Sequence, residues 1–409
     1  MPFAALGLGR KITRAIQEQG YVEPTPIQAK AIPLVLAGRD IVGVAQTGTG
    51  KTAAFVLPLL QLLATTPRRR AMRALIIAPT RELVVQIEEN VQAYARHLDL
   101  QGTTIYGGVG EKPQIAALRQ GVDLVVATPG RLLDLMARRL VDFSALGFLV
   151  LDEADRMLDM GFLPPIRKVV AALPASRQTL LFSATFSPEI ERIAAEFLRS
   201  PEVVRIGPRS TPVEAVSQSV IEVARESKLD LLLHLLSDAS LQMVLVFSRT
   251  KHGADKLARR LVEAGITTAK LHSNRTQGQR LQALKQFRSG EVRVLVATDI
   301  AARGIDVDGI SHVINYDFPP QPEDYVHRIG RTARAQAIGD AVSFVTPDDR
   351  ENLRGLEKFL GRGLPLRRVD VLPPRPRAAA PATYARRPPG RRPGSGSRPG
   401  APRRGRGRA

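Results

Sequence analysis

The feature that most constrains the fold of this chain is a glycine-rich loop between an apolar run and a helical pattern. The apolar run is Asp40–Ala45, and the helical pattern covers Lys51–Leu63. Between them and at the helix start lie Gln46, Thr47, Gly48, Thr49, Gly50, Lys51 and Thr52. Glycine lets backbone N–H groups approach phosphate oxygens, and the dipole of the following helix favours an anion. The pattern therefore predicts a strand, a phosphate-binding loop and a helix.

Two side chains of this loop carry specific chemistry. Lys51 supplies a positive charge to the outer phosphates of a nucleotide, and the Thr52 hydroxyl is a ligand for Mg²⁺. Ala45 stands where the general pattern has its first glycine, while Gly48, Gly50 and the residues that follow are in place. We therefore expect the loop to bind a nucleoside triphosphate with Mg²⁺.

Two carboxylates follow another apolar run, Phe148–Leu151. Asp152, at the end of this predicted strand, is suited to hold Mg²⁺ through water, and Glu153 is suited to orient and deprotonate an attacking water. A string of acidic residues is usually a solvated surface, but here it directly continues an apolar strand downstream of a phosphate loop. The combination predicts hydrolysis of the nucleotide.

Short apolar runs recur in both halves of the chain. In the first half the predicted strands are Asp40–Ala45, Ala74–Ala78, Asp123–Ala127, Phe148–Leu151 and Thr179–Phe182. In the second half they are Met243–Phe247, Thr268–Leu271, Arg293–Ala297, His312–Tyr316 and Ala341–Val345. Val, Ile and Leu dominate them, as in strands buried on both faces, and helical patterns such as Arg81–Leu98 lie between them. This rhythm predicts βαβ units and parallel sheets.

The strand rhythm breaks around Arg199–Glu214, which is rich in proline and glycine. A single sheet of about ten or more strands is uncommon, so two α/β domains are the simpler interpretation. We expect an N-terminal domain over 1–207, a linker over 208–214, a C-terminal domain over 215–366 and a tail over 367–409.

The charge of the chain is strongly positive, with a net value of +20. The segment from Val371 to Ala409 contains 11 Arg and no Lys, Asp or Glu, and the rest of the chain is basic as well. Excess positive charge favours a polyanion such as nucleic acid, although a merely solubilising surface is the alternative. From about Pro373 the tail is dominated by Pro, Arg, Gly, Ala and Ser, a composition that predicts disorder.

Cysteine is absent, which excludes disulfides, thiol catalysis and cysteine-ligated metals. The N-terminus does not show the pattern of a secretory signal peptide, and no apolar stretch reaches the roughly 18 residues of a membrane span. We therefore expect a cytoplasmic protein without a membrane partner.

A basic segment in the second half, His327–Arg334, is a source of positive charge for a γ-phosphate. Its arginines are expected in the domain opposite the phosphate loop, so they would reach the nucleotide only when the two domains close. This arrangement predicts that nucleotide state and domain closure are coupled, as with an arginine finger.

Taken together, these motifs resemble those of the DEAD-box RNA helicases, and within that family the chain is most similar to the bacterial RhlE-type group. The resemblance covers roughly residues 3–346 and implies two tandem RecA-like domains. The motifs that carry it, in family order, are Gly20–Gln28, Val44–Thr52, Pro79–Leu83, Gly107–Gly108, Thr128–Arg131, Leu151–Asp155, Ser183–Thr185, Val246–Thr250, Ala297–Asp306 and His327–Arg334.

The resemblance implies a role for each matching residue. Gln28 would read the adenine with Phe3 stacked on the base, Asp306 would contact the ribose, and Arg331 and Arg334 would act on the γ-phosphate of ATP. Ser183 and Thr185 would link hydrolysis to unwinding, and His327 would help couple domain closure to the first domain. The RNA backbone would be held by Thr80, Arg81, Gly108, Thr128, Arg131, Thr250, Thr298 and Arg303. The expected activity is ATP-dependent, local unwinding of short RNA duplexes or remodelling of ribonucleoprotein, with ribosomal or mRNA-decay particles as partners.

One segment departs from the family pattern. Ala333 stands where the family often has glycine, and Ala335–Ala337 replaces a glycine-containing turn, but the arginines keep their spacing. Three alternatives stay open at this point: a DNA-directed motor, an ATP-gated RNA clamp that does not unwind, and a basic scaffold protein. The scaffold leaves the nucleotide motifs unexplained.

Overall fold

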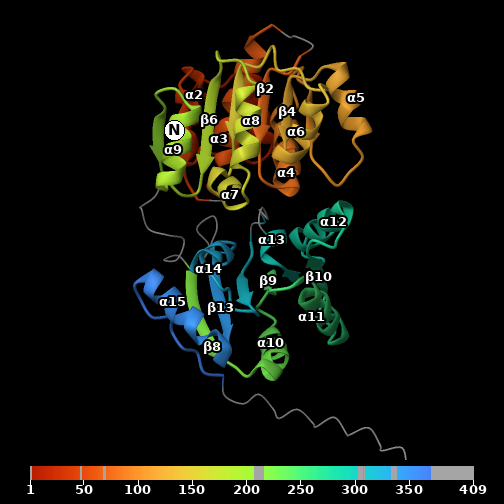
Figure 1. Ribbon diagram of the computed structural model, residues 1–409, viewed down its shortest axis with the longest axis vertical. Coiled ribbons are helices and arrows are strands. Elements are labelled where there is room, and N and C mark those ends of the chain that lie inside the picture. Colours follow the sequence, from red (N-terminus) through yellow and green to blue (C-terminus); the bar gives the residue numbers. More distant parts are fainter. Residues whose placement is uncertain are drawn as a thin grey trace, which may run out of the picture. The chain divides into compact units, whose positions relative to one another are not determined.

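The computed structural model of the protein describes residues 2–46, 48–67, 71–206, 216–302, 307, 309–332 and 339–369. They belong to one compact unit that ends at Asp370 and contains two separate sheets, each flanked by helices (Figure 1). The predicted linker over 208–214 lies outside the described residues, as does the predicted disordered tail beyond residue 369.

The first sheet has seven strands in the order β3-β4-β2-β5-β6-β1-β7, and every pairing in it is parallel. Its strands are β1 (Ile41–Val44), β2 (Ala74–Ile77), β3 (Gly102–Ile105), β4 (Leu124–Ala127), β5 (Phe148–Leu151), β6 (Gln178–Ser183) and β7 (Glu202–Arg205). The central strands are buried on both faces, which explains why they read as continuous runs of Val, Ile and Leu.

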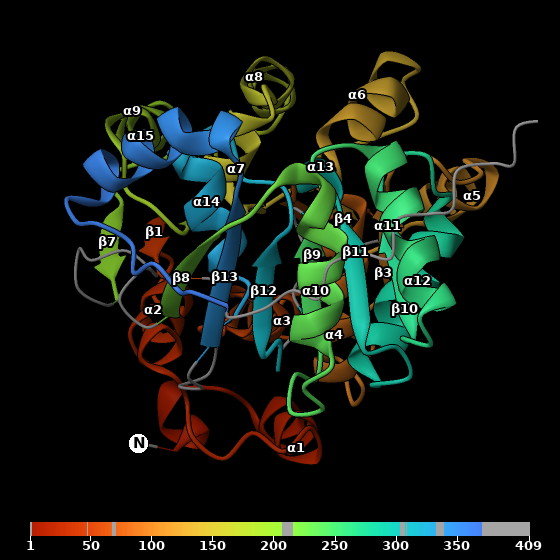
Figure 2. The ribbon, with the colours of Figure 1, turned by 90° about the horizontal axis from the view of Figure 1, so that it is seen from below.

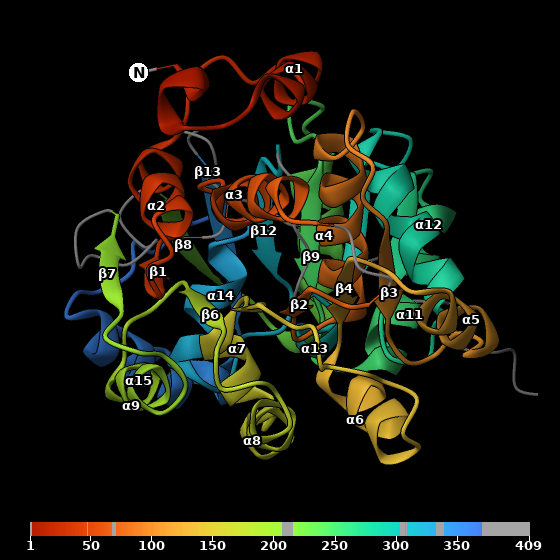
Figure 3. The same ribbon diagram turned by 90° about the horizontal axis from the view of Figure 1, so that it is seen from above.

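Helices cover both faces of the first sheet. The elements are η1 (Phe3–Leu6), α1 (Arg10–Glu18), α2 (Pro26–Leu36), α3 (Lys51–Thr65), α4 (Arg81–Tyr94), α5 (Lys112–Gln120), α6 (Pro129–Ala137), α7 (Ala154–Asp159), α8 (Leu163–Ala171) and α9 (Pro188–Phe197). Successive residues of one strand point to opposite faces. Thus Val126 of β4 joins the core beneath α1–α4, while Val125 joins the core beneath α6–α9 (Figure 3).

The second sheet has six parallel strands in the order β10-β11-β9-β12-β13-β8. These are β8 (Val216–Glu222), β9 (Val244–Phe247), β10 (Thr268–Leu271), β11 (Val294–Ala297), β12 (His312–Asn315) and β13 (Gly339–Val345). At the outer edge of β8, Val220 forms a parallel bridge with Leu366, so the end of the described chain covers part of this edge.

The remaining helices pack on the second sheet. They are η3 (Arg225–Ser227), α10 (Lys228–Leu236), α11 (Lys251–Glu263), α12 (Gln277–Arg288), α13 (Asp299–Ala302), α14 (Pro322–Ile329), η4 (Pro347–Asp349) and α15 (Arg350–Leu360). Tyr325 and Ile329 of α14 and Leu356 of α15 share a core with β8 and β13 (Figure 2). Among the helices described, none has both the length and the apolar character needed to span a bilayer.

The ten predicted strands match strands of the structure to within a residue or two at each end, but three strands were missed. β3, β7 and β8 all lie at sheet edges, where exposed polar residues replace the apolar run. The prediction that the chain breaks at Arg199–Glu214 is wrong for its first part, because Glu202–Arg205 forms β7 and pairs with β1. Likewise, α4 ends at Tyr94 rather than at Leu98.

The parallel order brings the motifs to one edge of each sheet. The phosphate loop follows β1, Asp152 follows β5, and the segment from Ala184 follows β6. In the second sheet, Ser248 follows β9 and Thr298 follows β11. Because the carboxyl ends of parallel strands meet at the same edge, this is where open α/β sheets bind ligands.

Candidate functional site

The phosphate loop is built on a left-handed backbone at two glycines. Gly48 has φ 82° and Gly50 has φ 87°, a region that side-chain-bearing residues rarely adopt. Lys51 begins α3, is 7% exposed, and donates from Nζ to the carbonyl oxygen of Ala45 at 2.6 Å. The lysine therefore lies folded over the loop, at the positive end of the α3 dipole.

Gln28 holds this loop from α2. It is fully buried, its Oε1 accepts from the Thr25 N–H at 2.9 Å, and its Nε2 donates to the Gly50 carbonyl at 3.1 Å. Thr25 and Gln28 form a capping box, which explains why the helix starts at Pro26. A β-carbon at Gly50 would collide with the Gln28 amide, so glycine is required here by space as well as by φ.

Phe3, the predicted stacking partner of the adenine, lies in the core beside α1 and α2. It is 4% exposed and meets the ring of Tyr21 edge-on at a centroid distance of 6.1 Å. The Tyr21 hydroxyl in turn lies 2.9 Å from the Tyr94 hydroxyl. Phe3 thus packs the N-terminal segment onto the first domain, and its contact with a base stays a prediction.

The two acidic residues after β5 are both buried. Burial raises the pKa of Asp152 to about 7, although the charge of Lys51 opposes this effect. Burial also disfavours the charged form of Glu153, but the charges of Arg156 and Arg331 outweigh it, so the pKa of Glu153 is lowered. The two neighbouring carboxyls therefore differ in how readily they ionise.

Asp155 connects the acidic strand end to the segment after β6. Its Oδ2 accepts from the backbone N–H groups of Ala184 and Thr185, each at 3.0 Å, and from the Thr185 hydroxyl at 3.2 Å. The Thr185 N–H also lies 3.4 Å from the Ser183 hydroxyl. Of the two predicted coupling residues, Thr185 bonds directly to the acidic motif, and Ser183 is linked to it through the Thr185 N–H.

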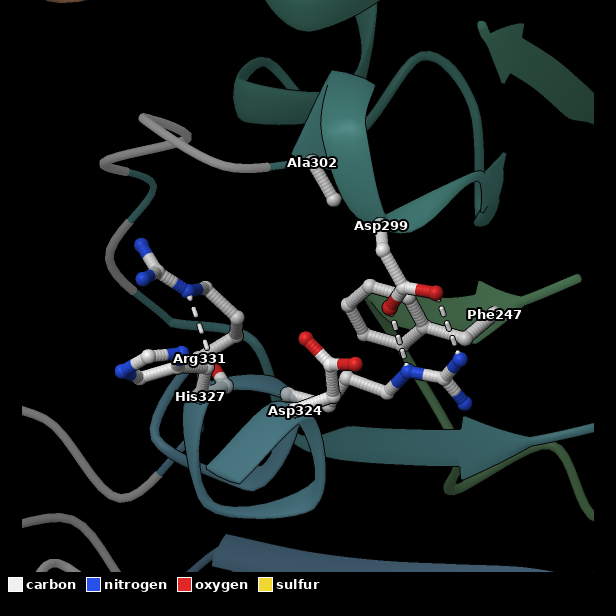
Figure 4. A pocket seen from close by; sticks show the side chains of 7 residues that line it. Phe247, Asp299, Ala302, Asp324, His327 and Arg331 are labelled. Atoms are coloured by element: carbon white, nitrogen blue, oxygen red, sulfur yellow. Dashed lines mark hydrogen bonds and ion pairs between the residues drawn. The ribbon is translucent and has the colours of Figure 1, made fainter. Parts of the chain in front are cut away.

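In the second domain, Arg331 follows α14 and His327 lies on it. The Arg331 Nε donates to the His327 carbonyl at 3.2 Å (Figure 4). The two side chains line a small pocket together with Phe247, Asp299 and Asp324. The structure therefore brings together the predicted phosphate-contacting arginine and the predicted coupling histidine.

Arg328, for which we predicted no separate role, anchors this pocket. It is 2% exposed and binds Asp299 through Nε at 2.5 Å and Nη2 at 2.7 Å. Its Nη1 donates to Asn315 Oδ1 at 3.1 Å and to the Asp317 carbonyl at 2.7 Å. A bidentate pair of this kind fixes orientation as well as charge, so Arg328 joins α14 to α13.

Among the predicted RNA contacts of the first domain, Arg81 and Gly108 meet. Gly108 has φ 80°, and a β-carbon there would collide with the Arg81 guanidinium. Thr80 caps α4 by accepting from the Leu83 N–H at 3.3 Å. Thr128 directly precedes α6, and Arg131 lies in the first turn of that helix.

Thr250 and Thr298, two predicted RNA contacts of the second domain, also lie between a strand and the start of a helix. Thr250 caps α11 by accepting from the Gly253 N–H at 3.0 Å. Thr298 directly follows β11 and precedes α13, whose Ala301 and Ala302 N–H groups bond to its carbonyl. Threonines at helix starts after strands thus recur in both domains, so these side chains lie at the sheet edges that carry the motifs.

A buried contact that no sequence motif predicts joins the two domains. Glu82 of α4 is 3% exposed, and its Oε1 accepts from Arg280 Nε at 2.7 Å and from Gln277 Nε2 at 3.0 Å, both on α12. Arg280 also donates from Nη2 to the Ala301 carbonyl at 3.3 Å. Glu82 adjoins Arg81, so the contact links RNA-motif segments of both domains.

Four predicted site residues lie outside the described residues. They are Thr47, Arg303, Asp306 and Arg334. The departure at Ala333 and at 335–337 lies outside them too. Within the described ranges, no group of three or more His, Cys, Asp or Glu side chains is placed to hold a metal ion by itself.

Comparison with known proteins supports the same interpretation. Residues 25–193 match the DEAD/DEAH box helicase family, and residues 227–336 match the helicase conserved C-terminal domain. The chain is 42% identical over 379 residues to the ATP-dependent RNA helicase CshA of Limosilactobacillus reuteri, covering 93% of this chain and 74% of the relative. It is 44% identical to the DEAD-box ATP-dependent RNA helicase CshA of Streptococcus pneumoniae, covering 88% and 68%.

Solved structures agree with the fold. Yeast (S. cerevisiae) Dbp5 bound to RNA and ADP BeF3 is similar with a TM-score of 0.79 and 33% identity, covering 90% of this chain and 95% of that one. Mss116p bound to ssRNA and AMP-PNP gives a TM-score of 0.78 at 27% identity, covering 90% and 79%. With two tandem RecA-like domains and these motifs, the chain belongs to the DEAD-box ATP-dependent RNA helicase family.

Proposed function

We propose that this protein uses the energy of ATP to open short RNA duplexes locally or to remodel ribonucleoprotein, and that RNA stimulates its ATPase. The observation that carries the proposal is the distribution of parts over two domains. The phosphate loop and the acidic strand end belong to the first domain, and Arg331 belongs to the second. The buried Glu82–Arg280 contact joins the domains beside both sets of RNA motifs.

The first domain supplies the groups that would bind the nucleotide and activate the attacking water. Loop N–H groups and Lys51 would bind the phosphates, and Gln28 would read the adenine edge with Phe3 on the base. Glu153 would accept the proton of the attacking water. From the second domain, Asp306 would contact the ribose, and the γ-phosphate would be met by Arg331 and Arg334.

The residues present fit Mg²⁺. Thr52 offers a hydroxyl at the start of α3, and Asp152 offers a carboxylate whose pKa burial raises to about 7, so a cation would relieve the cost of ionising it. Mg²⁺ commonly takes one or two protein oxygens and completes its shell with water and phosphate. When bound, it would neutralise charge on the phosphates.

RNA would be held mainly through its sugar and phosphate groups, without reading of sequence. The relatives named above include proteins solved with RNA, and the present chain has the matching segments. The residues proposed to line the RNA path are Thr80, Arg81, Gly108, Thr128, Arg131, Thr250, Thr298 and Arg303.

Several finer assignments stay proposals. The domain limits of 1–207, 208–214, 215–366 and 367–409 are supported by the two sheets, which lie on either side of the proposed linker. Membership of the RhlE-type group rests on the motifs alone, since the relatives named above carry the name CshA. A cytoplasmic location and a ribosomal or mRNA-decay particle as target complete the proposal.

The proposed activity is tested by measuring ATP hydrolysis with RNA and with DNA of the same sequence, followed by strand displacement on a short RNA duplex. We expect RNA, but not DNA, to stimulate ATP hydrolysis, and we expect ATP-dependent displacement of one strand of the RNA duplex. Equal stimulation by DNA would favour a DNA-directed motor. ATP-dependent RNA binding without displacement would favour a clamp.

A further inference from the structure

The carboxylate of Glu153 is held by a neighbouring side chain that none of the predicted motifs includes. Arg156 donates from Nη1 to Glu153 Oε2 at 2.7 Å. The side chains of both residues are almost completely buried, at 9% and 11% exposure. An ion pair in this setting is screened much less than a surface pair.

The backbone of Glu153 directs its side chain toward this partner. Glu153 has φ 52° and ψ 52°, a left-handed conformation that is uncommon for a residue with a side chain. Its N–H donates to Asp152 Oδ1 at 3.0 Å, and its carbonyl accepts from the Met157 N–H. Left-handed residues of this kind are held by their surroundings and gather at functional sites. Arg156 lies three residues further on, where the two side chains can meet across the first turn of α7.

The guanidinium of Arg156 depends on Glu153. Its Nε and Nη2 are buried and have no hydrogen-bond partner within the part of the chain that the structure describes. A buried cation needs a compensating partner, and the Glu153 carboxylate is the one that the structure supplies. The pair is therefore specific and mutual rather than a chance surface contact.

The other cations around Glu153 are engaged differently. Lys51 and Arg331 both lower the pKa of Glu153 by their charge, after burial and Arg156. However, Lys51 Nζ donates to the Ala45 carbonyl, and Arg331 Nε donates to the His327 carbonyl. Arg156, by contrast, donates its hydrogen bond to the Glu153 carboxylate itself. We therefore take Arg156 as the group that fixes the orientation of the Glu153 side chain.

We propose that Arg156 is a positioning residue for hydrolysis, which holds Glu153 by Oε2 so that Oε1 is aimed at the attacking water. This inference rests on the proposed role of Glu153 as the base. The water would lose its proton to Glu153 while its oxygen attacks the γ-phosphorus, and the bond to the β-phosphate oxygen breaks to release ADP. Arg156 touches neither water nor phosphate and acts only by restricting the rotamers of the base.

Two substitutions separate positioning from general damage. Arg156→Met keeps much of the length and removes the charge, whereas Arg156→Lys keeps a cation within reach of the carboxylate. We expect Arg156→Met to lower kcat roughly tenfold or more, because misplaced catalytic groups lose rate steeply. The KM for ATP and the RNA concentration for half-maximal stimulation should stay within about twofold, and Arg156→Lys should recover part of kcat.

A second buried ion pair provides the matched control. Arg73 Nη2 lies 2.7 Å from Asp123 Oδ1, with side-chain exposures of 6% and 2%. Arg73 precedes β2, so it lies at the opposite edge of the sheet from the nucleotide motifs. Arg73→Met should lower the thermal unfolding temperature at least as much as Arg156→Met while leaving kcat of the folded protein nearly unchanged.

The outcomes are decisive in both directions. A kcat within twofold of wild type for Arg156→Met would overturn the proposal. It would also be overturned if Arg156→Lys lost as much kcat as Arg156→Met, or if the KM of Arg156→Met for ATP rose in parallel with the loss of kcat. Faster hydrolysis by Arg156→Met would also overturn it, because Arg156 would then restrain the base. Glu153→Gln serves as the reference: if that variant hydrolyses ATP normally, the proposed base itself is wrong, whatever Arg156 does.

Discussion

The contact between Glu82 and α12 yields the sharpest prediction for coupling between the domains. Arg280→Ala removes a charged hydrogen bond of 2.7 Å whose side chains are 13% and 4% exposed, and it leaves the Glu82 carboxylate with only Gln277 on α12. Hydrogen bonds to charged groups contribute roughly 1.5–3 kcal/mol. Since 1.4 kcal/mol corresponds to a factor of ten in an equilibrium constant, the state in which α4 and α12 are in contact should become about ten- to a hundredfold less populated.

The assay is the RNA concentration that gives half-maximal ATPase at saturating ATP. For Arg280→Ala this concentration should rise by about the same ten- to hundredfold, while ATP binding to the first domain stays unchanged. Glu82→Gln should have a similar effect, and the double variant should be hardly worse than either single variant, because the two groups act on one contact.

An exposed pair of the second domain is the control. Arg260 and Glu263 of α11 lie 3.0 Å apart, but both side chains are more than half exposed. Pairs of this kind contribute about 0–1 kcal/mol, so Arg260→Ala should leave half-saturation nearly unchanged. If Arg280→Ala left the half-saturating RNA concentration unchanged, or if the effects of Glu82→Gln and Arg280→Ala were strictly additive, this contact would not couple the domains.

Three further outcomes are expected. Gly50→Ala should weaken ATP binding roughly tenfold or more, because its backbone is left-handed and a β-carbon would meet the Gln28 side chain. Gly38→Ala is the control, since Gly38 has φ 76° but open space around it, and this variant should bind ATP normally. Equal ATP affinities of the two variants would disprove this. Asp317→Asn should destabilise the fold by about 2 kcal/mol near neutral pH. Burial opposes ionisation of Asp317, but the Arg249 N–H and Lys228 lower its pKa on balance. The difference in unfolding free energy between wild type and Asp317→Asn, measured by denaturant titration, should therefore shrink as the pH falls below 3.8 and should not shrink on the alkaline side. Deleting residues 373–409 should weaken RNA binding and flatten its salt dependence by about 0.7 per lost phosphate contact, with maximal ATPase unchanged; equal slopes would show that the tail is only a solubilising extension.

The central strands and the nucleotide motifs were predictable because their signals are local. Burial on both faces forces β2 and β4 into continuous apolar runs, and a phosphate loop needs Gly48, Gly50 and Lys51 at fixed spacing. The edge strands lack such a run. β7 has three exposed residues of four, so Glu202–Arg205 resembled a connection rather than a strand.

The partners of buried charges were not predictable, because they are chosen by the tertiary fold. Glu82 and Arg280 are far apart in the sequence and meet only when α4 and α12 come together. Arg328, in the last turn of α14, and Asp299, at the start of α13, likewise meet only in the folded chain. Arg156 was within reach of sequence reasoning, since it lies three residues after Glu153, but that spacing alone does not distinguish a buried pair from a solvated helix face.

The role of Glu153 is tested most directly by single-turnover hydrolysis of ATP at saturating RNA, with wild type and with Glu153→Gln. We expect the variant to bind ATP and RNA with nearly unchanged affinity and to hydrolyse ATP more slowly by roughly two orders of magnitude or more, as loss of a positioned base requires. Hydrolysis at the wild-type rate would contradict the assignment of Glu153 as the base and with it the proposed mechanism.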